Sequence, residues 1–484
     1  MTMNITAIPV LSGSRGLLGH VAEMREDRLT LLRRAARELD DIGRLRFLHR
    51  HVLLLNTPAL VHEVLVEKAK SFDKPLATRV SLTPLVGDGL LSSKTDTRWR
   101  RRRRIVAPLF SHAESARFGE VMVHSAVQVA SRWNEGAVIP VMREATRIAM
   151  AVITACLFST EDLELADTIS KPLTGALEWT GHYGTSPAMM GQLVAHNLLR
   201  GLSRRLDGSA AARLEKLGAW LEQPFLVPGA RTSAMRADLA RIEERLLPLV
   251  TARRAAGGTK SDLLELLLRA CEQEGHLSDR ELRDEVVTFF VAGNETTASG
   301  ITWALSLLDR NPAVLSALER EVDALGGRRP TVEDLPRLAL CAQAFKEALR
   351  LYPPIYLFAR ESVEDVVIGR YHVPAGTSVY IAPYMIHRDP ALYPDPERFD
   401  PARFTPEAEA ARPRLAWMPF GAGPRVCVGA AFAHLEGTLV LATLLQRFRF
   451  ERVEDRPVDP LPFITLRPAW DLPMRVRRRE PIPG

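Results

Sequence analysis

The chain has 484 residues, 46% of them hydrophobic, and a formal net charge of +6 at pH 7. That apolar share is sufficient for a large folded core and excludes an intrinsically disordered chain. Length alone would suggest about three domains, but no linker, repeat or low-complexity segment divides the sequence. We therefore expect one domain over residues 1–484, with residues 1–20 as an N-terminal extension.

The charge and the cysteines exclude several further classes of protein. The arginines are spread along the chain without a nucleic-acid-binding motif, so no nucleic-acid partner is expected. The sequence has no run of about 18 apolar residues and no signal-type segment, so no integral membrane anchor is expected. The four cysteines are scattered along the chain, at Cys156, Cys271, Cys341 and Cys427, so a disulfide framework is not expected. We therefore expect a cytoplasmic, reducing location.

The first 95 residues are predicted to contain a small sheet and a helix. Residues Arg44–Asn56 mix apolar and basic side chains and end in a run of valine and leucine, which favours strands. Residues Ala59–Ala69 have a helical pattern. The segment Phe72–Ser93 is expected to be irregular because prolines and glycines interrupt it, at Pro75, Pro84, Gly87 and Gly89.

A run of arginines follows, from Arg98 to Arg104. Trp99 and Arg103 lie four residues apart and therefore share one face of the expected helix. The other arginines are expected to face solvent. They form either an ordinary solvated face or a basic patch that attracts an acidic electron-transfer protein.

Residues 131–275 are predicted to be mostly helical. Amphipathic patterns cover Leu163–Trp179, Met189–Leu206 and Met235–Arg254, and Pro248 is expected to kink the last of these helices. The segment Leu217–Gly229 gathers apolar side chains around two prolines. By composition alone, this cluster indicates simple packing.

The next helix is the longest one predicted. Ser278 and Glu281 form a capping box at its start, and Asn311–Pro312 ends it. About 32 residues at about 1.5 Å each give a length of roughly 48 Å, enough to cross a whole domain. Within it, Ala292–Thr297 combines a glycine with two threonines, which is unfavourable in a helix. Threonine hydroxyls can bond back to helix carbonyls and open the helix locally.

Two charged motifs follow in the last third of the chain. Glu347 and Arg350 lie three residues apart on the predicted helix Pro336–Leu351 and can pair on one face. Such pairs are common on protein surfaces, so this spacing alone indicates no function. The second motif, Pro396–Pro401, contains Arg398.

The most informative stretch is Phe420–Gly429, which has the pattern F-x-x-G-x-R-x-C-x-G. Its Cys427 lies just before a long apolar pattern, Ala430–Phe448, that predicts a helix. A thiol at a helix N-terminus is close to unpaired N–H groups and to the positive end of the helix dipole, which favour the thiolate. The glycines leave room for a flat ligand, and Arg425 places a charge two residues from the sulfur.

The whole pattern resembles the haem-binding signature of the cytochrome P450 family, of the soluble bacterial type. The resemblance extends from about Arg44 to the C-terminus. It implies a mainly α-helical fold with a smaller β-rich lobe, and a b-type haem between the long helix and the cysteine loop. Three further motifs of that family occur in the expected order: Trp99 with Arg103, Ala292–Thr297, and Glu347–Arg350 followed by Arg398.

The resemblance also assigns the cofactor-binding residues. Cys427 is the expected thiolate ligand of the haem iron, and Ala292 and Gly293 leave space above the iron for oxygen and substrate. The haem propionates are expected to meet cationic or N–H donors, which are Trp99, Arg103, Arg360 and Arg425. The signature adds Phe420, Gly421 and Gly429 to the cofactor-binding set.

Two residues of the long helix have catalytic roles by the same resemblance. Thr296 is expected to hold oxygen and a water above the iron, and Glu295 to help relay protons. Glu347, Arg350 and Arg398 are expected to form a buried network that holds the fold around the haem. Substrate-lining residues are expected at Val80, Leu82, Leu85 and Leu90, at Ile355–Phe358 and at Phe463–Leu466, with Leu217–Gly229 in a mobile lid.

These features predict a monooxygenase that inserts one atom of O2 into a lipophilic substrate, by hydroxylation or epoxidation. The substrate class stays open between a fatty acid, a terpenoid and a polyketide-type secondary metabolite. No reductase sequence follows, so electrons are expected from a ferredoxin or flavodoxin with its reductase, and the protein is expected to be a monomer. Two alternatives remain: an enzyme of this fold that catalyses desaturation, ring closure or rearrangement, and a non-catalytic haem-binding sensor.

Overall fold

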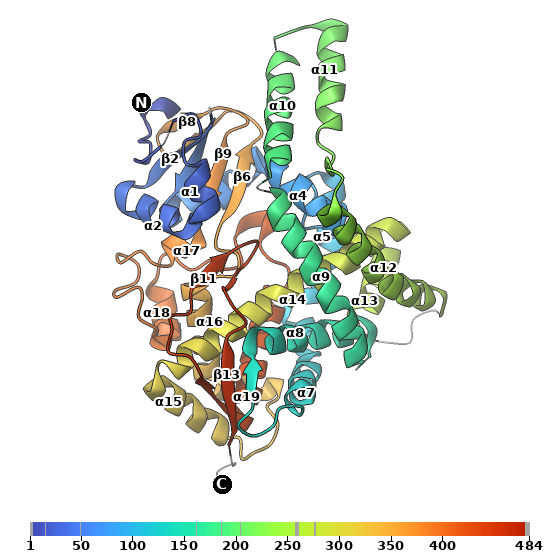
Figure 1. The fold of residues 1–484 in the computed structure, drawn as a ribbon, viewed down its shortest axis with the longest axis vertical. Helices are drawn as coiled ribbons and strands as arrows, with labels where there is room; N and C mark the ends of the chain where they lie inside the picture. The colour runs from blue at the N-terminus through green and yellow to red at the C-terminus, as the bar shows by residue number, and fades with distance from the viewer. Residues whose placement is uncertain are drawn as a thin grey trace.

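The computed structural model of the chain describes residues 3–14, 16–48, 50–160, 162–184, 186–203, 205–256, 261–274 and 277–479. Helices make up most of these residues, and the largest sheet lies at one end of the molecule (Figure 1). The chain has the expected fold class, mainly α with a smaller β-rich lobe. None of the described helices combines the length and the hydrophobicity that crossing a lipid bilayer requires.

The β-rich lobe contains a five-stranded sheet that joins distant parts of the chain. Its strands are β2 (Ile42–Phe47), β3 (Arg50–Leu55), β4 (Phe72–Asp73), β6 (Phe358–Ser362) and β9 (Ser378–Ile381). β3 pairs antiparallel with β2 and parallel with β9. β6 pairs antiparallel with both β9 and β4. The strands predicted within Arg44–Asn56 are therefore confirmed, and β4 is brought next to β6 from almost 300 positions away in the sequence.

Smaller sheets contain the other described strands. One is made of β1 (Met3–Asn4), β7 (Val366–Ile368) and β8 (Tyr371–Val373), and another of β5 (Val138–Pro140), β10 (Phe448–Arg452) and β13 (Pro473–Arg478). A two-stranded sheet pairs β11 (Pro460–Pro462) with β12 (Leu466–Pro468). Because β1 pairs with β8 and the Ile8 and Leu11 side chains are buried, the segment expected to be an extension packs against the β-rich lobe.

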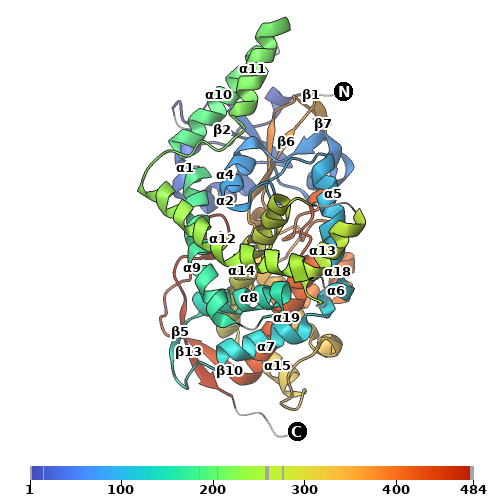
Figure 2. The same ribbon diagram turned by 90° about the vertical axis from the view of Figure 1, so that its right-hand side faces the viewer.

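The helices surround one large cluster of buried apolar side chains. In the first half of the chain they are α1 (Val21–Glu26), α2 (Arg28–Glu38), α3 (Pro58–His62), α4 (Leu76–Val86), α5 (Thr97–Val106), α6 (His112–Ala116), α7 (Gly119–Ala130), α8 (Val141–Phe158), α9 (Leu163–Gly184), α10 (Pro187–Ser203) and α11 (Gly208–Trp220). In the second half they are α12 (Ala230–Ala256), α13 (Leu263–Glu274), α14 (Asp279–Asp309), α15 (Pro312–Asp323), α16 (Ala339–Leu351), α17 (Pro383–Ile386), α18 (Pro406–Ala411) and α19 (Ala430–Arg447). α10 and α11 project together from the body in both views (Figure 1, Figure 2).

The predicted long helix is α14, which crosses the middle of the molecule (Figure 1). Its capping box is present, since the Ser278 hydroxyl accepts from the Glu281 N–H at 3.3 Å and the Glu281 carboxylate accepts from the Ser278 N–H at 3.0 Å. The helix packs against α8, α16, α19 and α4. Residues from the N-terminal, central and C-terminal parts of the chain therefore meet along one helix.

The prediction of an irregular segment after β4 was wrong for part of that segment. Phe72–Ser93 was expected to be irregular, but it contains the eleven-residue helix α4. Pro75 lies at the N-cap, where a proline costs little, and Pro84 lies in the last turn, close to the C-cap residue Gly87. Gly87 has φ of 58°, which ends the helix in a conformation that glycine adopts readily. Pro75, Pro84 and Gly87 thus mark the ends of a helix, whereas residues 87–93, which contain Gly89, are irregular as expected.

Candidate active site

The loop that precedes α19 presents Cys427. Its shape depends on Gly421 and Gly423, which both have φ of 69°. A Cβ atom on Gly423 would lie 1.8 Å from the Leu65 carbonyl oxygen, so only glycine fits there. The Cys427 N–H donates to the Phe420 carbonyl at 2.9 Å and closes the loop. The Cys427 side chain is exposed, unlike those of the other three cysteines in the chain, which are buried.

Opposing effects act on the Cys427 thiol. Although the side chain is exposed, partial desolvation by the surrounding protein raises the pKa of the thiol, whereas the Gly429 N–H and the Arg103 charge lower it. The preference for the thiolate stays a prediction. Coordination to a metal ion would deprotonate the thiol. A Cβ atom on Gly429 would lie 4.0 Å from the sulfur, so this residue leaves the sulfur accessible.

Trp99 and Arg103 share a face of α5, as predicted. The Trp99 side chain is buried, and its indole N–H donates to the Leu90 carbonyl at 3.1 Å. The Arg103 guanidinium lies 5.7 Å and the Arg425 guanidinium 4.3 Å from the centre of the Trp99 ring. The aromatic ring therefore contacts two cations. Its indole donor is already used by the backbone, so Arg103 is the more available of the two predicted donors.

The neighbouring arginines do not all face solvent. The Arg102 side chain is only 2% exposed and pairs with Asp88 at 3.2 Å and with the buried Glu285 at 3.6 Å. The Leu90 N–H donates to the same Glu285 carboxylate at 3.1 Å. Arg102 therefore connects the loop after α4 to α14. The expectation that all arginines of this run other than Arg103 face solvent was wrong for Arg102. Arg98, by contrast, is 71% exposed.

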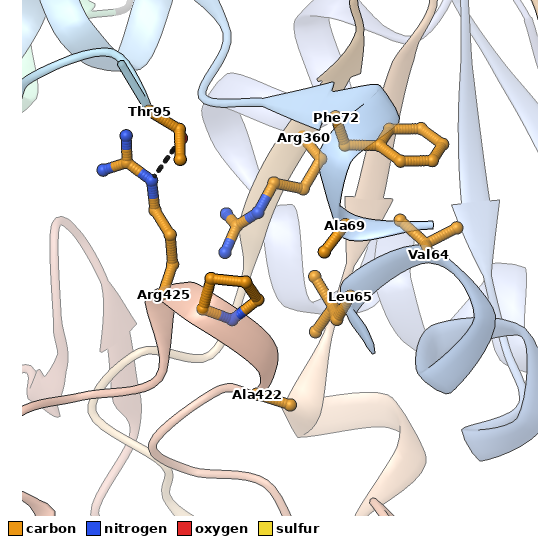
Figure 3. A pocket seen from close by; sticks show the side chains of 9 residues that line it. Val64, Leu65, Ala69, Phe72, Thr95, Arg360, Ala422 and Arg425 are labelled. Carbon is orange, nitrogen blue, oxygen red and sulfur yellow. Dashed lines mark hydrogen bonds between the residues drawn. The ribbon is translucent and has the colours of Figure 1, made fainter. Parts of the chain in front are cut away.

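A pocket lies between the cysteine loop and the β-rich lobe, and Arg360 and Arg425 both line it (Figure 3). Arg360 points toward the middle of the lining residues, whereas Arg425 points toward Thr95. The Arg425 guanidinium donates to the Thr95 hydroxyl at 2.9 Å, to the Ser93 carbonyl at 2.6 Å and to Asp73 at 3.3 Å. Arg360, on β6, donates to the Ala359 carbonyl at 2.9 Å. The full lining is Val64, Leu65, Ala69, Phe72, Thr95, Arg360, Ala422, Pro424 and Arg425.

The pocket region contains more buried positive charge than negative charge. Burial lowers the pKa of Arg360 and of Arg425 to about 10, and it also lowers the pKa values of Arg103 and Lys74. Asp73 is the one carboxylate of the described residues in contact with any of these four cations. A ligand with two carboxylates would supply the missing negative charge. The propionates of a haem fit this requirement, and the accessible Cys427 sulfur fits its iron.

Sequence reasoning missed Lys74 and Asp73. The Lys74 ammonium group donates to the Leu91 carbonyl, and its pKa is well below its usual value because it is buried. Lysine is rare in this chain, and Lys74 stands between Asp73 and Pro75, just before α4. No local pattern distinguishes it from Lys68 and Lys70, which lie close by in the sequence. Only the pairing of β4 with β6 shows that Lys74 lies near Arg360.

On α14, Thr296 makes the predicted bond back to the helix, whereas its role toward oxygen stays a prediction. Its hydroxyl donates to the Ala292 carbonyl at 2.6 Å, so this carbonyl is shared between a side chain and the helix. The Ala292 side chain is exposed and Gly293 is half-buried, although most of this helix is buried. A small-residue face is therefore open at this point of the helix.

Glu295 points elsewhere. Its carboxylate lies 3.4 Å from the Arg467 guanidinium, which also reaches Glu178 on α9 at 3.3 Å. Burial is the largest effect on Glu295 and raises its pKa. The acid and the alcohol predicted as a pair are thus adjacent in the chain but have separate hydrogen-bond partners.

The Glu347–Arg350 pair is present and completely buried. Arg350 donates to both oxygens of Glu347, at 2.6 Å and 2.8 Å, and both side chains are 0% exposed. Arg350 also donates to the carbonyls of His387 and Pro396, each at 2.7 Å. This geometry confirms that the spacing i, i+3 marks a buried pair here and not a surface one.

The third arginine of this network was wrongly assigned to Arg398. The Arg398 side chain is exposed, and only its backbone carbonyl contacts Arg350, at 3.2 Å. The side chain that reaches Glu347 is Arg403, at 3.5 Å. The sequence contains the pattern P-x-R-F twice, ending at Phe399 and at Phe404, and the second copy supplies the arginine. The neighbouring phenylalanine is buried in both copies, so the local pattern does not distinguish the two arginines, and only the fold places Arg403 next to Glu347.

This network is connected to the cysteine loop through His387. The His387 ring nitrogen Nδ1 is 3.2 Å from the Arg350 carbonyl, and Nε2 accepts from the Met418 N–H at 2.9 Å. Burial lowers the pKa of His387 well below its usual value, so the ring is neutral and can accept this bond. Met418 lies two residues before Phe420, so the network fixes the start of the loop that presents Cys427.

The expected substrate-lining residues are found in different environments. Val80 and Leu85 are buried in the main core, whereas Leu82 and Leu90 are partly buried against it. Phe463 lies beside α9, because its ring would meet a Cβ atom on Gly181 at 2.5 Å. The segment Leu217–Gly229 has Trp220 and Phe225 exposed.

Comparison with known proteins agrees with this site. A family model for cytochrome P450 matches residues 12–196 and 220–469. The chain is 33% identical to cyclooctatin synthase of Streptomyces melanosporofaciens, over 94% of this chain and 93% of that protein. It is 30% identical to pentalenene oxygenase of Streptomyces avermitilis, over 88% and 87%. The structure matches a solved cytochrome P450DA heme domain with a TM-score of 0.82 and 28% identity, over 98% of both chains. The chain therefore belongs to the cytochrome P450 family, oxidoreductases whose haem is held by a cysteine thiolate.

Proposed function

We propose that this protein binds haem through Cys427 and inserts one atom of O2 into a lipophilic substrate, by hydroxylation or epoxidation. The main support is the combination of an accessible cysteine sulfur with four partly buried cations, of which only Arg425 pairs with a carboxylate of the described residues. A terpenoid is the substrate class that we favour, because relatives named for cyclooctatin and pentalenene cover most of the chain. Residues 1–484 would act as one domain.

The residues around the pocket would hold the cofactor. Cys427 would bind the haem iron, and Arg103, Arg360, Arg425 and Lys74 would neutralise the two propionates. Phe420, Gly421 and Gly429 would shape the loop against the macrocycle, and Trp99 would support Arg103 and Arg425 through its ring. When bound, the haem supplies the iron that binds oxygen and accepts electrons.

The residues of α14 would handle oxygen and protons. Ala292 and Gly293 provide the open face, and the Thr296 hydroxyl beside them can orient a water molecule. Glu295 can take up and release a proton closer to neutral pH than an exposed glutamate, because burial raises its pKa. Arg467, 3.4 Å away, would orient the Glu295 carboxylate.

Electrons would come from a separate acidic protein, a ferredoxin or flavodoxin. The exposed arginines on α5, Arg98 and Arg100, lie on the same helix as Trp99 and Arg103. A basic surface next to the cofactor site would attract an acidic partner and speed its encounter.

The test of this proposal is the carbon monoxide difference spectrum of the reduced protein, for the wild type and for Cys427→Ser. We expect the red-shifted Soret band of a thiolate-ligated haem in the wild type and its loss in the variant. An ordinary haem–CO band in both proteins would mean that another residue binds the iron, and the proposed function would then be wrong. Oxygen uptake that depends on supplied electrons and substrate would separate an enzyme from a sensor.

A further inference from the structure

We propose that Asp73 is a positioning residue of the cofactor site, which fixes Arg425 through the Thr95 hydroxyl and balances the charge of the pocket. This inference rests on the proposed haem site. None of the motifs found in the sequence includes Asp73 or Thr95. Asp73 ends β4, and Thr95 lies in the segment between α4 and α5, so neither belongs to the cysteine loop.

The Asp73 carboxylate is held by donors from three parts of the chain. The Thr95 hydroxyl donates to Oδ1 at 2.6 Å, and the Thr95 N–H donates to Oδ2 at 3.0 Å. The Lys74 N–H donates to Oδ1 at 2.8 Å, and Arg425 Nη2 lies 3.3 Å from the same oxygen. These bonds lower the pKa of Asp73, against the effect of burial, so it is ionised at neutral pH.

An ionised Asp73 determines which way the Thr95 hydroxyl points. A carboxylate can only accept, so the Thr95 proton is directed toward Asp73. The lone pairs of the Thr95 oxygen then face Arg425, whose Nε donates to them at 2.9 Å (Figure 3). Asp73 therefore sets the plane of the Arg425 guanidinium through Thr95, as well as by direct contact.

Asp73 also connects the cofactor site to the segment after α4. Arg425 Nη2 donates to the Ser93 carbonyl at 2.6 Å, and Lys74 donates to the Leu91 carbonyl. The cations expected to meet the propionates are thus the ones that hold residues 91–95 in place. We infer that this segment, with Asp73 as its anchor, closes one side of the haem pocket.

The experiment compares Asp73→Asn with Asp88→Asn in the haem-loaded full-length protein. Asp88 is a matched control, because it lies in the same segment and pairs with an arginine, Arg102, at 3.2 Å but does not contact the four pocket cations. Two properties are measured: the rate at which haem is transferred to excess apomyoglobin, and the midpoint potential of the haem.

We expect Asp73→Asn to release haem at least about tenfold faster, because Arg425 loses its fixed orientation toward a propionate. We also expect its midpoint potential to become more positive. Ferric haem has one more positive charge than ferrous haem, so the loss of a nearby negative charge favours the reduced form. Asp88→Asn should change the haem release rate by less than about twofold and leave the potential unchanged. Asp73→Glu should restore the potential.

Three results would overturn the proposal. Equal effects of Asp73→Asn and Asp88→Asn would mean that Asp73 only anchors the segment. Slower haem release in Asp73→Asn would mean that Asp73 acts as an unfavourable charge and not as a positioning residue. An additive effect of Thr95→Val in the Asp73→Asn background would mean that Asp73 does not act through Thr95. Failure of the haem-thiolate proposal is distinguishable, because the wild type itself would then lack the red-shifted carbon monoxide band.

Discussion

Two clusters of cations and carboxylates in this protein differ in how far the protein itself compensates their charge. Around Glu347, one carboxylate lies between Arg350 and Arg403, and the remaining Arg350 donors are satisfied by backbone carbonyls. Beside the pocket, four partly buried cations lie near a single carboxylate of the described residues, Asp73, which forms an ion pair with Arg425 only. Both clusters are formed by residues far apart in the sequence.

The difference separates a structural cluster from a binding cluster. In the Glu347 cluster the protein supplies most of the partners itself, because Glu347 accepts from Arg350 and from the Asp400 N–H, so this cluster stabilises the fold. The cluster beside the pocket contains Arg103, Arg360 and Arg425, whose pKa values are lowered by burial. The positive charges of these side chains are therefore not fully compensated by the protein. An anionic cofactor would complete it. The same residue types therefore serve the fold in one place and the ligand in the other.

The largest effect is expected from breaking the Glu347 cluster. Glu347→Ala leaves Arg350 and Arg403 buried without their carboxylate, at a cost of about 3–5 kcal/mol of unfolding free energy. Because Arg350 also holds His387, which accepts from Met418 before the cysteine loop, haem content should fall with stability. Thermal or urea unfolding of the purified variant and its haem-to-protein ratio measure both effects.

The control for this variant is Glu409→Gln. Glu409 pairs with Lys346 at 2.8 Å, but both side chains are partly exposed. We expect a loss of less than about 1 kcal/mol and normal haem content. A similar loss in both variants would contradict the distinction between the two kinds of ion pair.

A smaller effect should distinguish Arg403 from Arg398. Arg403 reaches Glu347 at 3.5 Å and donates to the Pro394 carbonyl at 2.6 Å, so Arg403→Ala should cost about 2 kcal/mol of unfolding free energy. Arg398→Ala removes an exposed side chain and should cost less than about 0.5 kcal/mol. Urea unfolding of the two variants gives the comparison, and a larger loss for Arg398 would restore the original assignment from the sequence.

The sequence predicted those parts of the site that lie within one local motif. The cysteine loop, the α14 motif and the Glu347–Arg350 pair were found because their residues are a few positions apart, within a helix turn or a tight loop. The assignment of Arg398 was wrong because two P-x-R-F patterns are five residues apart, and only the fold shows which arginine points inward.

The pocket could not be predicted from local patterns. Asp73, Thr95, Arg360 and Arg425 meet because β4 pairs with β6 in a register that places Asp73 opposite Glu361, next to Arg360. No periodicity in the sequence encodes a pairing over this separation. Local patterns were also insufficient for α4. Its prolines were interpreted as signs of an irregular segment, although they lie near the ends of a helix.

The smallest expected effect is a pH dependence of haem binding that arises from Lys74. Burial holds the pKa of Lys74 well below its usual value in the protein alone, and a nearby propionate would raise it. At a pH between these two pKa values, haem binding is accompanied by uptake of a proton, so haem affinity should fall as the pH rises, by at most about tenfold per pH unit.

The Lys74→Met variant should bind haem more weakly at neutral pH, and its haem affinity should depend less on pH. Haem transfer rates measured from about pH 7 to about pH 9 test this, because Arg360 and Arg425, with pKa values of about 10, stay largely charged over that range. An identical pH dependence in the wild type and in Lys74→Met would show that Lys74 is not among the cations that complete the site.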